Sequence, residues 1–235
     1  MQLFYNPDIT EETTKIIFPK DESRHIIKVL RKSEGDILHI TNGRGWLFTA
    51  KISMADIKNC VAIIRDKEKQ EKRSYQVHLA VAPTKMNDRY EWFLEKATEI
   101  GIDIITPIIC DNSERKIIKP ERFEKILQAA MKQSLSCYIP KLQEAITFKE
   151  FVSLPQFKQK FIAHCEETDK KSLKSQIIPN QDITILIGPE GDFSYKEIEQ
   201  ALSSQFIPVT LGETRLRTET AAIVACHSVA FINES

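Results

Sequence analysis

The sequence predicts an α/β protein in two parts: a small β-barrel over residues 1–73, then a larger α/β domain with a mostly parallel sheet over residues 74–235. Three observations support this prediction. Short segments of alternating apolar and polar residues fill the first part. In the second part, apolar strand-like runs alternate with helical patterns, and a charged run separates the two parts. A chain of 235 residues is long enough to form two cores.

The first part begins with a short helical pattern within residues 18–31. Three segments of period two follow, at residues 36–40, 46–52 and 60–64. Asn42-Gly43 lies between the first two segments, and this dipeptide between alternating runs is typical of a tight hairpin. Several short strands in so short a stretch predict a small β-barrel.

The boundary between the parts is the charged run at residues 65–73, which has almost no apolar content. Such a run indicates either a solvated connector or the exposed end of a long strand pair. We therefore divide the chain at residue 73.

In the second part, apolar runs predict strands at residues 77–81, 104–110, 161–164, 183–187 and 206–211. Helical patterns lie between these runs, so the crossover connections favour parallel pairing with helices on both faces of the sheet. We expect this alternation to produce one covered, mostly parallel sheet.

The helices of the second part carry recognisable start and stop signals. Residues 88–100 form a helix for which Asn87 or Asp88 is the expected cap and Gly101 the stop. Pro120 marks the start of another helix. The capping-box pattern at residues 194–197 starts a third helix, and Thr218 is the expected cap of the last.

Composition argues against a disulfide-rich, zinc-binding, secreted or membrane-spanning protein. The formal net charge is zero, although residues 1–73 hold 14 Lys and Arg against 11 Asp and Glu, and the remainder holds 19 against 22. This mild asymmetry suits local rather than global attraction for phosphate. Five scattered cysteines indicate neither a disulfide framework nor a zinc site. We expect a cytoplasmic protein, because residues 1–7 do not resemble a signal peptide and the apolar stretch at 221–232 is too short for a membrane span.

Two C-terminal segments are the strongest candidates for a ligand site. Residues 187–191 and 211–221 each follow a predicted strand and precede a helix, and together they hold three of the seven glycines. Loops that leave parallel strands at their carboxyl ends can meet in one crevice, and glycine permits close approach of the backbone to a ligand. Ordinary strand-to-helix turns are the alternative interpretation.

These loops lack the common nucleotide-binding motifs, which limits the ligands they could bind. They contain neither G-x-G-x-x-G nor a phosphate-binding loop ending in Gly-Lys-Ser/Thr, so a dinucleotide or nucleoside triphosphate is disfavoured. Backbone groups could still hold an adenine ring. Arg215 and Arg217 precede a helix, where positive charge is not favoured by the helix dipole, which suggests a functional demand. Residues 218–220 could be no more than cap and first-turn residues. The five histidines show no metal-ligand spacing.

Five motifs together resemble one family. They are the segment Leu186–Ser194, the segment Leu211–Ala222, the segment Lys85–Gly101, and the segments Ala129–Ser134 and His25–Arg31. Taken in the order in which they occur along the chain, they resemble the RsmE family of 16S rRNA (uridine-N3) methyltransferases, part of the SPOUT superfamily. The resemblance covers nearly the whole chain.

This resemblance implies a deep trefoil knot in the α/β domain, a PUA-like β-barrel that binds RNA, a homodimer and S-adenosylmethionine as cofactor, with no metal and no membrane. Its partner would be 16S rRNA or the 30S subunit. The knot loops would hold the cofactor through Ile187, Gly188, Pro189, Glu190, Gly191, Leu211, Gly212, Leu216, Arg217, Thr218, Thr220 and Ala221. Two departures from the family pattern are Asp192, where a second glycine is common, and Lys132, where an acidic residue is common.

A mechanism follows as a hypothesis. Arg217 would stabilise negative charge on the uracil carbonyl oxygens, and Glu219 or Glu190 would accept the N3 proton. Because base pairing hides N3, the target uridine must be unpaired or flipped out. The expected RNA-binding residues are Arg24, His25, Arg31, Arg44, Lys85 and Arg89.

Two other functions remain open. A SPOUT enzyme that methylates the ribose 2′-oxygen would share the same loops. A non-catalytic RNA-binding protein would keep the barrel and a vestigial α/β domain, although the intact glycines and Arg217 disfavour it. A nicotinamide-dependent oxidoreductase is disfavoured because the glycine fingerprint is missing.

Overall fold

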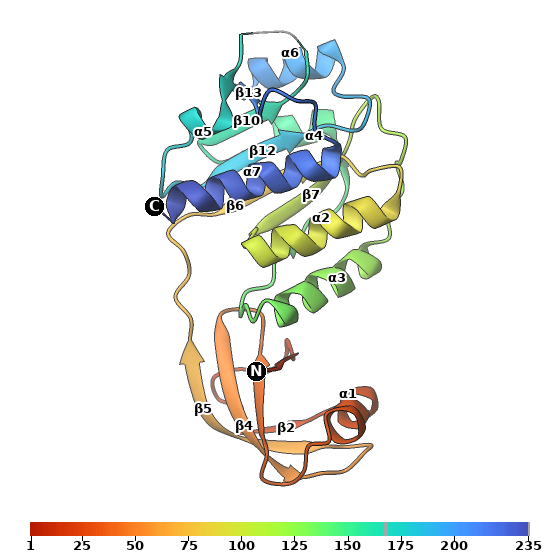
Figure 1. Ribbon diagram of the computed structural model, residues 1–235, viewed down its shortest axis with the longest axis vertical. Helices are drawn as coiled ribbons and strands as arrows, with labels where there is room; N and C mark the ends of the chain where they lie inside the picture. Colours follow the sequence, from red (N-terminus) through yellow and green to blue (C-terminus); the bar gives the residue numbers. More distant parts are fainter. Residues whose placement is uncertain (167–168, 235) are drawn as a thin grey trace. The chain divides into compact units, whose positions relative to one another are not determined.

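A computed structural model describes residues 1–166 and 169–234. The chain forms two compact units, one of residues 1–72 with 131–139 and one of residues 73–130 with 140–235. Each unit has its own sheet (Figure 1). The α/β class with a mostly parallel sheet is confirmed.

The first unit contains a five-stranded sheet in the order β1-β3-β4-β5-β2. Its elements are β1 (Leu3–Tyr5), β2 (Lys15–Ile17), α1 (Lys20–Arg24), the π-helical turn η1 (His25–Val29), β3 (Ile37–Thr41), β4 (Trp46–Met54) and β5 (Val61–Lys69). The hairpin predicted at Asn42-Gly43 is present, since β3 and β4 pair antiparallel across it. The strands β1 and β2 lack a clear alternating pattern and were missed.

The two end strands of this sheet, β1 and β2, are not hydrogen-bonded to each other, and side chains fill the space between them. β1 and β2 stand at the two ends of the hydrogen-bonded order, and the rings of Phe4 and Phe18 lie 5.8 Å apart in edge contact. Both rings belong to the apolar core of this unit together with Ile40 and Phe48. The charged run at residues 65–73 is partly the exposed end of β5, where five consecutive residues are exposed.

The first unit also includes residues 131–139, which the division at residue 73 assigned to the second domain. The Tyr138 hydroxyl donates to the Gln70 carbonyl at 2.8 Å, and the Gly45 N–H donates to the Cys137 carbonyl at 2.8 Å. A Cβ at Gly45 would lie 2.3 Å from the Tyr138 hydroxyl, so this contact requires glycine. A division at a single point in the sequence could not predict these contacts, because they join residues far apart along the chain.

The second unit is a parallel eight-stranded sheet in the order β11-β13-β10-β12-β6-β7-β8, with β9 also paired to β7. The strands are β6 (Val77–Val81), β7 (Ile104–Ile109), β8 (Lys141–Leu142), β9 (Ile146–Thr147), β10 (Gln159–Ala163), β11 (Lys171–Ser172), β12 (Ile183–Ile187) and β13 (Ile207–Thr210). Every residue of β12 is buried, as expected for a strand covered on both faces.

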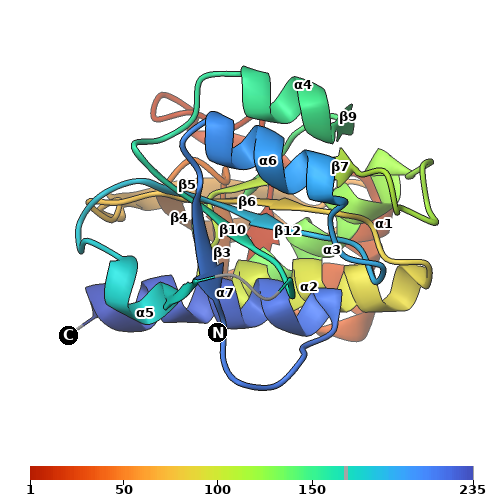
Figure 2. The ribbon, with the colours of Figure 1, turned by 90° about the horizontal axis from the view of Figure 1, so that it is seen from above.

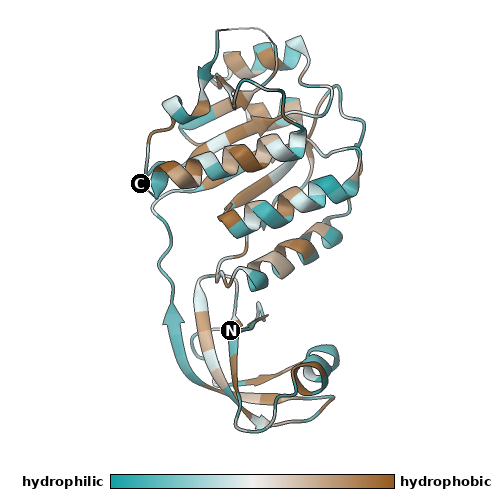
Figure 3. Cartoon of the chain, viewed as in Figure 1, coloured by the Kyte–Doolittle hydropathy of each residue, from teal (hydrophilic) through white to brown (hydrophobic). Residues whose placement is uncertain are grey.

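Helices cover both faces of this sheet (Figure 2). One face carries α4 (Phe148–Ser153) and α6 (Tyr195–Ser203), and the other carries α2 (Asn87–Ile100), α5 (Leu173–Gln176) and α7 (Thr218–Asn233). Helix α3 (Pro120–Gln133) begins at the predicted proline and contacts α2 through the rings of Tyr90 and Phe123. Hydrophobic residues are concentrated on the central strands and on α7, whereas the end of β5 is hydrophilic (Figure 3).

Three of the predicted helix ends can be compared with the structure. Gly101 ends α2 with φ of 107°, and Ser194 with Glu197 forms the predicted capping box of α6. The predicted caps of α2 are wrong, because α2 already includes Asn87 and follows an extended Met86 without a side-chain cap. The knot that the resemblance implies stays a prediction.

Candidate functional site

The two glycine-bearing loops meet at the carboxyl ends of the parallel strands. β12 and β13 lie on either side of β10, so their loops leave the same edge of the sheet. The Thr218 hydroxyl donates to the Gly188 carbonyl at 3.0 Å, and the Arg215 guanidinium lies 3.4 Å from the Glu190 carbonyl. The expected meeting of these loops is therefore present.

Thr218 does not cap α7, which corrects the sequence prediction. Arg217 occupies the cap position with an extended backbone and without a side-chain cap bond, and Thr218 is the first helical residue. The Thr218 hydroxyl is used between the loops instead. A threonine before a helical pattern signals a cap from sequence alone, but here Thr218 is already helical, one residue past the cap position.

A cavity of about 460 Å³ opens beside these loops. Three segments line it: the end of β10 with its following residues, the end of β13 with the loop after it, and the first part of α7. The lining residues are Ala163, His164, Cys165, Lys170, Val209, Thr210, Leu211, Gly212, Glu213, Thr214, Arg215, Leu216 and Ala221. Of the predicted cofactor-binding residues, Leu211, Gly212, Leu216 and Ala221 are in the wall.

Sequence reasoning missed the β10 segment of this wall. Ala163, His164 and Cys165 follow a buried apolar run in the same way as the two recognised loops do. The signal that could have found them is the position rule itself, because β10 is parallel to its neighbours and ends at the same edge. Unlike the two recognised loops, this segment contains no glycine.

The three glycines of the two recognised loops have different roles. A Cβ at Gly188 would lie 3.1 Å from the Phe193 ring, and one at Gly191 would lie 3.1 Å from the Asn112 Cβ. At both positions the protein is therefore packed so closely that a side chain would force Phe193 or Asn112 to move. Gly212 has φ of 148° and no atom within 4 Å of its Cβ position. Gly212 alone has both the backbone freedom and the open space that a ligand contact needs.

Asp192, one of the two departures from the family pattern, has a backbone conformation that glycine adopts without strain. Its φ is 63°, a left-handed conformation that aspartate tolerates better than most residues. Its carboxylate accepts the N–H of Cys165 at 2.7 Å and its own neighbour's N–H, that of Phe193, at 2.9 Å. Asp192 thus ties the β12 loop to the segment after β10.

Glu190 also ties segments together. One carboxylate oxygen accepts the Lys85 N–H at 2.9 Å, and the other, Oε2, is buried and has no hydrogen-bond partner within the described residues. Lys85 itself is exposed and pairs with Glu114 at 2.8 Å. Within the described residues, Oε2 of Glu190 is therefore available to accept a hydrogen bond or a proton.

Glu219 lies in the first turn of α7 and is 7% exposed. Its Oε1 is 3.9 Å from the Arg89 Nε, and its Oε2 has no hydrogen-bond partner in the part of the chain that the structure describes.

Glu190, Arg217 and Glu219 lie outside the cavity wall, with the Arg217 side chain exposed beside it. The remaining predicted residues are the buried Ile187 and Pro189 and the half-buried Thr220.

Four predicted RNA-binding residues belong to the first unit. Arg24 and Arg31 are exposed, and Arg31 has φ of 55° just after the π-helical turn. His25 lies 3.2 Å from the Gln2 amide nitrogen. Arg44 donates to the carbonyls of residues 7 and 9, at 2.8 and 3.2 Å, so most of its guanidinium is used to hold that loop. Lys132, the second departure, lies 4.0 Å from Glu22 in this same unit.

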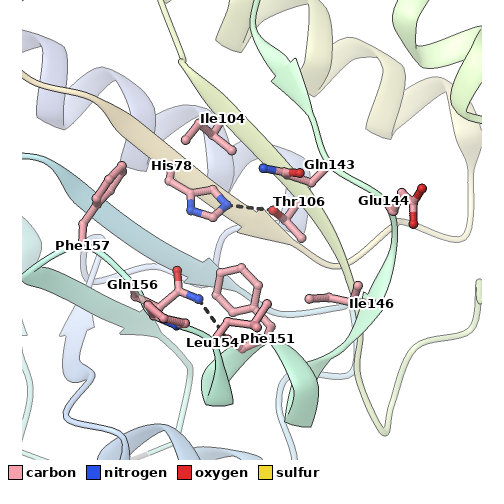
Figure 4. A pocket seen from close by; sticks show the side chains of 11 residues that line it. His78, Ile104, Thr106, Gln143, Glu144, Ile146, Phe151, Leu154, Gln156 and Phe157 are labelled. Carbon is pink, nitrogen blue, oxygen red and sulfur yellow. Dashed lines mark hydrogen bonds between the residues drawn. The ribbon is translucent and has the colours of Figure 1, made fainter.

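A second cavity, of about 690 Å³, lies at the opposite, amino ends of β6 and β7 (Figure 4). His78 shares a hydrogen bond of 2.8 Å with the Thr106 hydroxyl, and its ring contacts Phe151 and Phe157 at centroid distances of 5.4 and 6.3 Å. Burial lowers the pKa of His78 to about 4. Of the polar side chains that line this larger cavity, His78 and Thr106 are paired with each other, and the Gln156 amide donates to the Phe151 carbonyl at 2.9 Å.

These features define a class: an α/β protein with a ligand cavity at the carboxyl ends of a parallel sheet, joined to a small β unit. A model of the RNA methyltransferase domain family matches residues 70–230, and a model of the RNA methyltransferase PUA domain matches residues 18–65. The chain belongs to the RNA methyltransferase family. The resemblance found in the sequence is thereby confirmed, and with it the assignment to an enzyme class.

Similar proteins extend over almost the full length. Ribosomal RNA small subunit methyltransferase E of Buchnera aphidicola is 33% identical, with 91% of this chain and 87% of that protein covered. A structure described as a probable rRNA-methyltransferase from Porphyromonas gingivalis has a TM-score of 0.92 and 42% identity, over 100% of this chain and 99% of that one. Ribosomal RNA small subunit methyltransferase E of Neisseria gonorrhoeae, bound to S-adenosyl methionine, has a TM-score of 0.86 and 26% identity, over 99% and 98%.

The described ranges contain neither a helix suited to span a membrane nor a cluster of metal-binding side chains. None of the helices there is long and apolar enough to cross a membrane. Within the same ranges, His, Cys, Asp and Glu do not gather in a group of three or more that could hold a metal ion.

Proposed function

We propose that this chain transfers a methyl group from S-adenosylmethionine to N3 of a uridine in 16S rRNA of the small ribosomal subunit. The observation that carries the proposal is the cavity of about 460 Å³ where the ends of β10 and β13 meet the start of α7, in a chain of the RNA methyltransferase family. Relatives named for the methylation of small-subunit ribosomal RNA support the substrate, and the base and atom rest on the family resemblance.

The residues around the cavity fit this cofactor. When bound, S-adenosylmethionine supplies a methyl group activated by a sulfonium centre. It carries no phosphate, which agrees with loops that lack phosphate-binding fingerprints. Open space beside Gly212 suits close contact with the backbone. Leu211, Leu216 and Ala221 line the wall, while residues 187–191 hold the neighbouring loop in place.

Arg217 is the proposed electrostatic group. It is exposed beside the cavity at the start of α7, so its guanidinium can face a base that approaches from solvent. Removal of the N3 proton places negative charge on the uracil carbonyl oxygens, and a nearby guanidinium stabilises that charge.

Glu219 is the preferred acceptor for the N3 proton, with Glu190 as the alternative. Both have a buried oxygen without a partner among the described residues. Glu190 already accepts the Lys85 N–H at 2.9 Å, which favours a role in holding the loop. Among the described residues, the Glu219 carboxylate is held by the longer 3.9 Å contact with Arg89.

RNA would be held by Arg24, His25, Arg31, Arg44, Lys85 and Arg89 through its phosphates. Exposed basic side chains at Arg24 and Arg31 support this assignment better than Arg44, whose guanidinium already donates to two carbonyls. Phosphate contacts position the substrate without reading its sequence.

We further infer a cytoplasmic homodimer that acts on 16S rRNA or the 30S subunit. Exposed aromatic rings at Trp92 on α2 and Phe231 on α7, 46% and 55% exposed, offer apolar surface for a second copy. Light scattering coupled to size-exclusion chromatography measures this directly, and a mass of one chain, near 27.0 kDa, would contradict the dimer.

The decisive experiment is mass spectrometry of 16S rRNA nucleosides from a strain that lacks the gene. We expect 3-methyluridine to be lost, and to return when the wild-type chain is supplied but not when Arg217→Ala is supplied. Retention of 3-methyluridine would contradict the assignment, and loss of a 2′-O-methylated nucleoside instead would favour the ribose methyltransferase.

A further inference from the structure

His164 is a buried histidine whose hydrogen-bonding groups are unused. It follows β10 directly and is 7% exposed, and neither ring nitrogen has a partner within residues 1–166 and 169–234. Buried polar groups in folded proteins are nearly always hydrogen-bonded, so an exception of this kind points to a partner that comes from outside the chain.

This side chain belongs to the wall of the cavity of about 460 Å³, together with Ala163 and Cys165. The backbone around it is held from two directions. The Lys170 ammonium donates to the His164 carbonyl at 2.8 Å, and the Cys165 N–H donates to the Asp192 carboxylate at 2.7 Å. The segment is therefore fixed in place while the imidazole itself is left without a partner.

The charge state of His164 suits a positively charged cofactor. Burial lowers its pKa, and the Lys170 ammonium acts in the same direction, whereas Asp192 and Glu166 act against it. A neutral imidazole offers one donor and one acceptor, and it does not repel a sulfonium ion. A protonated one would oppose binding.

We propose that His164 is a cofactor-binding residue that hydrogen-bonds to the adenosine half of S-adenosylmethionine. The adenine edge and the ribose hydroxyls each combine donors with acceptors, as a neutral imidazole does, while the carboxylate and ammonium of the methionine half each offer only one kind. This inference rests on the proposed function, because it requires that the chain bind this cofactor.

Calorimetric titration of the full-length chain tests the assignment. The ligands are S-adenosylmethionine, S-adenosylhomocysteine and 5′-methylthioadenosine, of which the last lacks the amino-acid half. His164→Phe keeps a ring and removes both nitrogens, so we expect all three ligands to bind about tenfold more weakly or worse. His164→Gln keeps one donor and one acceptor and should retain most of the affinity.

Thermal unfolding without ligand separates binding from structure. Because the nitrogens of His164 have no partner in the described protein, His164→Phe should melt at the wild-type temperature or above it. A histidine held by internal water would instead lose stability on this substitution while ligand affinity stayed the same, and that result would overturn the inference. His39→Phe in the first unit is the matched control and should leave all three affinities unchanged.

The remaining outcomes distinguish the two proposals. If the wild-type chain binds S-adenosylmethionine and His164→Phe binds it equally well, the role of His164 is wrong while the proposed function stands. If the substitution weakens the two larger ligands but not 5′-methylthioadenosine, the adenosine assignment is wrong. If the wild-type chain binds none of the three ligands, the proposed function fails, and this inference fails with it.

Discussion

The two cavities of the parallel sheet differ in how their polar groups are used. The larger one, at the amino ends of β6 and β7, contains His78, which bonds to Thr106 at 2.8 Å and packs between aromatic rings (Figure 4). The smaller one, at the carboxyl ends, contains His164 with both nitrogens unpaired among the described residues. Size alone would select the amino ends. Unpaired polar groups, rather than volume, mark the candidate site.

This difference makes a general prediction. Substitutions at the carboxyl ends should alter ligand binding or turnover more than stability, and substitutions at the amino ends should do the reverse. The following experiments test that prediction in order of decreasing expected effect.

Arg217→Ala should produce the largest change. Loss of a group that stabilises developing charge lowers turnover by about 10²–10³-fold, whereas S-adenosylmethionine affinity and melting temperature should change little. Single-turnover methylation of 30S subunits and calorimetry measure the two properties. Arg217→Lys keeps the charge and should recover part of the rate. Full turnover in Arg217→Ala would remove this residue from the mechanism.

The stability of the chain should depend on pH through His78. Its pKa is about 4 when folded and about 6.5 in an unfolded chain. As the pH falls from 6.5 towards 4, the unfolded chain takes up a proton that the folded chain excludes, so stability falls by at most about 3 kcal/mol and levels off below that range. Urea unfolding at a series of pH values measures this loss. His78→Leu should flatten the curve, and an unchanged slope in that variant would show that other groups cause it.

Gly188→Ala sharpens the comparison within the carboxyl-end loops. Because a Cβ would lie 3.1 Å from the Phe193 ring, we expect a loss of about 2 kcal/mol in the free energy of unfolding. Gly212→Ala meets no atom within 4 Å, so its cost is limited to the backbone strain at φ of 148°. A loss at Gly188 of less than about 0.5 kcal/mol would contradict its assignment as a packing glycine.

Thr106→Val should have the smallest effect. It removes the hydroxyl that bonds to His78 at 2.8 Å and should cost about 1 kcal/mol of stability without changing cofactor affinity. Thr184→Val in β12 is the matched control, because the buried Thr184 hydroxyl has no hydrogen-bond partner in the described chain. The control should be neutral or slightly stabilising, and a larger loss there than at Thr106 would contradict the assignment of partners.

Much of the architecture was predictable because it follows from local patterns. The apolar runs at 77–81 and 183–187 coincide with β6 and β12, and the Asn42-Gly43 turn joins β3 to β4. The capping box of α6 and the glycine at the end of α2 were found for the same reason, since each signal depends on residues close in sequence. The short edge strands β1 and β2 have no such signal.

The candidate site was predictable only in outline. Position after a buried strand located the loops at residues 187–191 and 211–221, and their contacts through Thr218 and Arg215 agree with that expectation. The third segment, at His164, has no glycine and no motif, so only the placement of β10 between β12 and β13 brings it into the wall. The roles of Arg217, Glu219 and Glu190 stay predictions.

The sequence by itself determined the family, the central strands and longer helices of the α/β unit, and two neighbouring loops, of which the one at residues 211–221 lines the cavity. These depend on periodicity, turn residues and motifs that are each contained in a short stretch. Tertiary structure decided which glycines are needed for packing, that Thr218 bonds to Gly188 instead of capping α7, and that His164 lacks a partner within the described chain. The physical reason is that packing and hydrogen-bond satisfaction depend on neighbours in space, and here those neighbours are often more than twenty residues apart along the chain.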